Sequence, residues 1–110
     1  MPLNSPEIQR AITKIHQTIR ILDQSASGWA ANIRIELDKI ERGISFVRKE
    51  AFTTIGGLCH PMAMGDTFVH GMTNLQWVAY LDSLREACVA AFNLLEREFG
   101  TLSEAERLQH

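Results

Sequence analysis

Apolar residues recur every three or four positions along two long stretches of this chain. The first stretch carries them at Ile8, Ile12, Ile15, Ile19 and Leu22. The second carries them at Ile33, Leu37, Ile40, Ile44, Val47 and Ala51. This spacing places the apolar side chains on one face of an α-helix, whereas a half-buried strand would alternate apolar and polar residues. The pattern therefore predicts an all-α fold.

The ends of the first two helices are predicted from capping residues. Ser5 and Pro6 suit the N-cap and the first helical position, which predicts a helix over about residues 5–25. The second apolar stretch predicts a helix over about residues 28–52. Gly43 lies inside it and costs about 1 kcal/mol relative to alanine, so we expect either a bend or a close helix crossing at this glycine.

A third helix is predicted over about residues 74–99. Thr73 and Gln76 form a capping box at its start, and Gly100 is a candidate stop. Its apolar residues cover an arc of roughly 160°, which is too wide for contact with one neighbour. We therefore expect this helix to pack against both others and against a second copy of the protein, in a homodimer.

After Gly100, Ser103 and Glu106 form a weak capping box, which predicts either a short C-terminal helix or a frayed tail. The resulting fold is a small antiparallel bundle of three main helices, joined in part by a long connector rich in glycine and methionine. The 110 residues are 45% hydrophobic and 22% charged, as expected for one globular domain over residues 1–110.

Charge and composition argue against several classes of function. The formal net charge is −2, so no strong positive field would attract nucleic acid or an anionic bilayer. The longest weakly charged stretch is interrupted by glycines and proline, which predicts no membrane crossing. Two cysteines and the lack of a recognisable leader make the cytoplasm the expected compartment.

The connector, residues 55–72, concentrates the unusual chemistry of the chain. Its sulfur and imidazole side chains are Cys59, His60, Met62, Met64, His70 and Met72. These groups suit Cu(I), or Zn(II) with Asp66 added, so a soft-metal site at Cys59, His60 and His70 is one hypothesis. The spacing argues against it, because Cys59 and His60 are adjacent and structural zinc ligands are usually two to four residues apart. The alternative is that the methionines are flexible apolar filler.

A catalytic interpretation would make Cys59 a nucleophile, with His60 or His70 as base and Asp66 as the orienting carboxylate. All four residues lie in one short segment, whereas catalytic groups normally converge from several rigid elements. We therefore predict that the protein is not an enzyme and requires no cofactor.

No known family is recognised in the sequence. The leading hypothesis is a small non-enzymatic interaction protein, of adaptor, chaperone-like or inhibitor type, that acts as a homo-oligomer and binds a protein partner. Methionine and glycine adapt to a partner's surface, and large apolar residues outside the helical stripes supply contact area. The predicted partner-binding residues are Ile35, Phe46, Met62, Met64 and Phe68. The soft-metal site in residues 55–72 is the alternative function.

Overall fold

The computed structural model describes residues 5–108, including their side chains except at position 45 and positions 98–108. The elements in chain order are α1 (Pro6–Gln24), α2 (Trp29–Arg42), α3 (Ser45–Leu58), the 3₁₀ turn η2 (Met64–Asp66) and α4 (Asn74–Leu108). No strand occurs within residues 5–108. The predicted all-helical class is confirmed.

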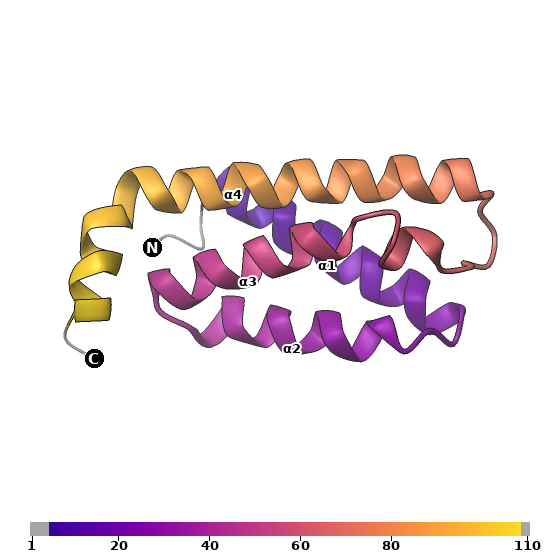
Figure 1. Ribbon diagram of the computed structural model, residues 1–110, viewed down its shortest axis with the longest axis horizontal. Helices are drawn as coiled ribbons and strands as arrows, with labels where there is room; N and C mark the ends of the chain where they lie inside the picture. The colour runs from indigo at the N-terminus through magenta and orange to yellow at the C-terminus, as the bar shows by residue number, and fades with distance from the viewer. Residues whose placement is uncertain (1–4, 109–110) are drawn as a thin grey trace.

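Successive helices run in opposite directions along the bundle (Figure 1). α4 packs against α1 and α3, and α2 packs against the same two helices. α2 and α4 therefore occupy opposite corners around one shared core. The largest fully buried side chains of this core are Trp77, Phe52, Ile8, Ile15, Leu22, Ile33, Ile40, Ile55, Met64, Leu81, Leu84 and Leu95.

The predicted helix over residues 28–52 is wrong, because the structure divides this stretch into α2 and α3. Gly43 and Ile44 take extended backbone conformations, with ψ angles of 167° and 171°. A Cβ atom on Gly43 would overlap the Lys39 carbonyl oxygen and lie 2.9 Å from Val47 Cγ1. The chain can reverse here because glycine leaves this space free, and Ile44 is exposed instead of continuing the buried stripe.

A buried arginine ties the two halves of this reversal together. Arg48 is only 9% exposed, and its Nε donates a 2.7 Å hydrogen bond to the carbonyl oxygen of Ile40. Carbonyls in the last turn of a helix lack an intrahelical partner. Arg48, near the start of α3, therefore supplies a hydrogen-bond donor to one such carbonyl at the end of α2.

For the last predicted helix, the predicted start is confirmed and the predicted end is wrong. The capping box is confirmed: the Thr73 amide donates to Gln76 Oε1 at 2.9 Å, and the Gln76 amide donates to Thr73 Oγ1 at 3.1 Å. The predicted stop at Gly100 is wrong, because α4 continues to Leu108 and no separate C-terminal helix forms there. Its end turns away from the main axis (Figure 1). The side chains of Ser103 and Glu106 lie outside the described residues.

The predicted connector is also more ordered than its composition indicates. Residues 55–58 extend α3, and η2 lies in the middle of the remaining segment. We call residues 59–73, between α3 and α4, the connector segment. It closes one end of the bundle (Figure 1).

Candidate protein-binding surface

Three large apolar side chains are strongly exposed in the connector segment and the start of α4. Met62 is 85% exposed, Phe68 79% and Leu75 82%. Met62 and Phe68 were predicted as partner-binding residues. Sequence reasoning missed Leu75, although its place beside the capping box and outside the buried stripe of α4 was a usable signal. We call these three residues the connector surface.

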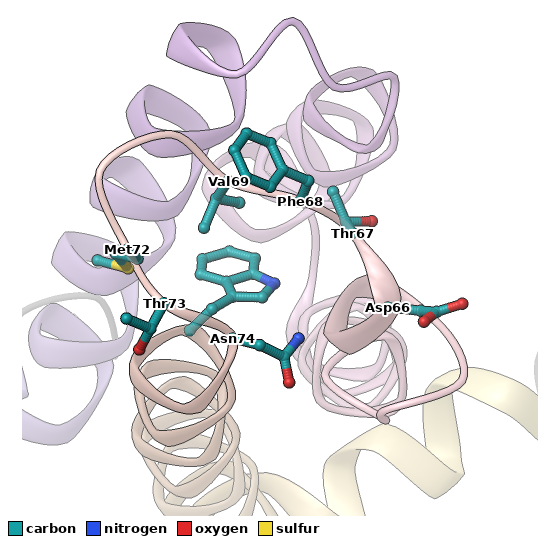
Figure 2. A pocket seen from close by; sticks show the side chains of 8 residues that line it. Asp66, Thr67, Phe68, Val69, Met72, Thr73 and Asn74 are labelled. Carbon is teal, nitrogen blue, oxygen red and sulfur yellow. The ribbon is translucent and has the colours of Figure 1, made fainter.

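A cavity of about 310 Å³ opens beside Phe68. Its lining includes Thr67, Phe68, Val69, Met72, Asn74 and Trp77. Figure 2 shows Val69, Met72, Thr73 and Asn74 around the hollow, with the Phe68 ring beside Val69 and the Asp66 carboxylate directed away. The hollow therefore has a mixed lining, in which the polar residues Asp66, Thr67, Thr73 and Asn74 alternate with apolar side chains.

The indole of Trp77 joins this cavity to the core. Trp77 is fully buried, and its Nε1 donates a 2.7 Å hydrogen bond to the Met64 carbonyl oxygen. Its ring stacks on Tyr80 with centroids 5.7 Å apart. The Tyr80 hydroxyl lies 3.0 Å from Thr18 Oγ1 and donates to the Lys14 carbonyl oxygen at 3.1 Å. One chain of contacts thus fixes the connector segment to both α4 and α1.

Further hydrogen bonds hold the backbone of the connector segment. The His70 amide donates to Ser25 Oγ at 2.8 Å, which anchors the segment to the end of α1. Asn74 Nδ2 donates to the Gly65 carbonyl oxygen at 3.4 Å. Gly71 has a φ of +86°, a conformation that glycine adopts without steric cost. The exposed apolar residues therefore stand on a fixed backbone.

The other predicted partner-binding residues lie elsewhere. Met64 is fully buried beneath the connector segment, as a filler methionine would be, and it cannot contact a partner in this conformation. Ile35 is 57% exposed on α2, whereas Phe46 is half-buried on α3 and lines a different cavity. The sequence placed Ile35 and Phe46 on one helix, and the reversal at Gly43 separates them.

The metal candidates are divided between the core and the surface. Cys59 is buried and its Sγ donates to the Ile55 carbonyl oxygen at 3.4 Å. His60 and His70 are exposed, and His60 Nδ1 accepts a 3.0 Å hydrogen bond from the Met62 amide. No group of three or more His, Cys, Asp and Glu side chains with metal-binding geometry occurs in the described part of the chain.

The thiols are also electrostatically unsuited to act as thiolates. Burial raises the pKa of Cys59 from 9.0 to about 12, and a smaller opposing effect comes from the Arg85 guanidinium. Burial likewise raises the pKa of Cys88 to about 12. Because the thiolate is the form that attacks carbon, the raised pKa disfavours both cysteines as nucleophiles at neutral pH.

No protein-family profile, curated protein or solved structure matches this chain. Within the described residues, no helix is both long enough and apolar enough to cross a bilayer. The arrangement of the side chains is therefore the basis for inferring function.

Proposed function

We propose that this protein is a non-enzymatic protein-binding module that captures a partner at the connector surface. The observation that carries the proposal is the exposure of Met62 and Phe68 on a segment whose backbone is hydrogen-bonded to α1 and α4, together with the exposure of Leu75 in the first turn of α4. Leaving large apolar side chains in water is unfavourable by about 25 cal/mol per Å² of apolar surface. A partner that covers these residues recovers that free energy.

The cavity defines the chemistry of the expected partner. An opening of about 310 Å³ whose apolar lining consists of Phe68, Val69, Met72 and Trp77 is suited to an aromatic or long aliphatic side chain. Thr67, Thr73 and Asn74 surround the apolar surface and can hydrogen-bond to the partner's backbone. We therefore expect a peptide segment with one large apolar anchor residue. The fixed backbone favours binding, because less conformational entropy is lost than in ordering a mobile loop.

A displayed peptide library panned against the full chain tests the proposal. Peptides with a Phe, Trp, Leu or Met anchor should be enriched. Adding such a peptide should change the amide chemical shifts of this protein at Met62 and at residues 66–77. The variant Phe68→Asp should lose the selected peptides. Ile35→Asp, which introduces the same charge at an exposed apolar position on α2, should retain them.

Two results would contradict this proposal. One is the absence of enriched peptides from a library that yields binders to a control target. The other is a peptide whose affinity is equal for the wild type and Phe68→Asp. Circular dichroism of each variant excludes unfolding as the cause, and we expect both to melt near the wild type because both positions are exposed.

The soft-metal hypothesis has less support from the structure. Its thiol is buried and protonated, and Met64 is part of the core. Titration with Cu(I) or Zn(II) gives a direct test, since a bound ion stabilises the fold in proportion to its affinity. A thermal shift that disappears in Cys59→Ala would favour the metal site over the proposed function.

A further inference from the structure

α4 carries a second stripe of residues outside the fully buried core, with Phe92 at its inner edge packed against that core. Its members, spaced alternately by four and three residues, are Val78, Asp82, Arg85, Val89, Phe92 and Glu96. Spacing of this kind aligns side chains along one face of a helix, as in the contact seams of paired helices. Val89 is 49% exposed at the middle of the stripe, and Phe92 beside it is half-buried.

This stripe borders a groove between α3 and α4. Three cavities of about 390, 210 and 330 Å³ follow one another along it: the first two share Thr53 and Phe92, and the last two share Gly56 and Arg85. A Cβ atom on Gly56 would meet nothing closer than Arg85 Cγ at 4.0 Å. Gly56 thus leaves room for another backbone to approach. We call this feature the α3/α4 groove.

Each end of the groove carries charged residues of both signs: Arg85 lies beside Asp82 at one end, and Glu96 beside Lys49 at the other. Arg85 lies at one end, with its side chain 54% exposed and a long 3.6 Å contact to the Asp82 carboxylate. Glu96 lies at the other end and is equally exposed, with one carboxylate oxygen 2.5 Å from the buried Lys49 Nζ. More than half of the Glu96 side chain is exposed to solvent, so a further donor can reach its carboxylate. Val89 and Phe92 occupy the space between Arg85 and Glu96.

We propose that the occupant of the α3/α4 groove is a second copy of this chain, with the two α4 helices antiparallel about a two-fold axis between Val89 and Phe92. Arg85 and Glu96 are equidistant in sequence from that axis, so each Arg85 faces Glu96 of the other copy. Val89 of each copy likewise packs against Phe92 of the other. A two-fold interface must be self-complementary, and the part of the stripe from Arg85 to Glu96 meets that requirement, because it pairs opposite charges at its ends and apolar residues at its centre. This inference is independent of the connector surface.

Sedimentation velocity of the full chain over the micromolar range tests whether the dimer exists. The wild type should reach twice the chain mass of 12.4 kDa. Val89→Asp should sediment as a monomer, because it buries two carboxylates near the axis against an aromatic ring. Ile35→Asp is the matched control and should remain dimeric, since α2 lies at the opposite corner of the bundle.

A double-mutant cycle tests the antiparallel register. Arg85→Glu places like charges opposite each other and should weaken dimerisation by at least about tenfold. In the Glu96→Gln background, which retains an oxygen acceptor for Lys49, the same substitution should have a much smaller effect because the opposing charge is gone. Circular dichroism establishes that each variant is folded before its mass is compared.

A monomeric wild type at the highest concentration would overturn the proposal, as would a dimer that survives Val89→Asp. Equal effects of Arg85→Glu in the two backgrounds would overturn the register. Binding of the library peptides at the connector surface would be unaffected by Val89→Asp if the two surfaces are independent. The two proposals can therefore fail separately.

Discussion

The chain reverses direction at both ends of α3, and different contacts stabilise the two non-helical joints. The joint between α2 and α3 consists of Gly43 and Ile44, and it depends on a missing Cβ atom and one hydrogen bond from Arg48. The joint between α3 and α4 is the connector segment, which depends on a buried indole and side-chain to backbone hydrogen bonds.

The difference shows that exposed apolar residues need not indicate a loose segment. The short joint exposes one large apolar residue, Ile44. The connector segment exposes Met62 and Phe68 although its backbone is held at several points. Two residues of the connector segment itself, Met64 and Val69, are buried and stabilise its position on the bundle. The outward-facing residues are therefore free to serve as a contact surface.

The largest expected effect follows from the removal of Trp77, which anchors the connector segment. Trp77→Ala deletes a fully buried indole, its stack on Tyr80 and its hydrogen bond to Met64. We expect a loss of about 3–5 kcal/mol in the free energy of unfolding, measured by urea denaturation. Leu75→Ala, two positions away and exposed, should change it by less than about 0.5 kcal/mol. A small effect of Trp77→Ala would mean that the connector segment is held mainly by its backbone.

The next test uses pH to compare how well solvent is excluded beside the connector segment and around the middle of α4. The pKa of Cys59, beside the connector segment, and that of Cys88, inside α4, both rise from 9.0 to about 12. Above pH 9 the folded protein therefore keeps thiol protons that the unfolded chain releases. The contribution of the two thiols to the free energy of unfolding is fully present below pH 9 and is lost as the pH rises from 9 to 12. The slope is at most about 1.4 kcal/mol per pH unit for each thiol.

Thermal melts of the wild type and of the single variants Cys59→Ala and Cys88→Ala, measured from pH 8 to 11, would separate the two contributions. Each variant should show a shallower decline than the wild type. If Cys59→Ala leaves the slope unchanged, its thiol already titrates in the folded state and solvent is excluded less well beside the connector segment than around the middle of α4.

The smallest expected effects concern glycine in and beside α3. Gly43→Ala forces a Cβ atom against Lys39 and Val47 and should destabilise the protein by about 1–3 kcal/mol. Gly57→Ala meets no atom within 4 Å and should stabilise it by about 0.5–1 kcal/mol, because alanine has the higher helix propensity. Chemical denaturation measures the change in the free energy of unfolding for each variant. Changes of opposite sign would support the steric account of the α2–α3 joint, and changes of the same sign would refute it.

Much of the helical structure was predictable from local signals. Ser5 accepts the expected capping hydrogen bond from the Ile8 amide, and the Thr73–Gln76 capping box forms as predicted. The break at Gly43 was only half predictable, because the apolar spacing continues through Ile44 and Val47 as if the helix were unbroken. Local periodicity contains no information about the space around Lys39, which decides the conformation there.

The candidate site was less predictable than the helices. Met62 and Met64 are two residues apart and chemically identical, yet one is 85% exposed and the other fully buried. Met64 stands where the connector segment contacts α4, because its backbone carbonyl accepts a hydrogen bond from Trp77, 13 positions later. No pattern within the connector segment encodes that contact.

The sequence alone determined that the protein is helical, because side-chain spacing and capping residues act within a few positions of each other. Only the tertiary structure decided that residues 5–108 form four α-helices instead of the three predicted, and which connector residues face water. Those outcomes depend on contacts between distant positions, such as Tyr80 with Lys14 and His70 with Ser25, and such contacts exist only once the helices have packed.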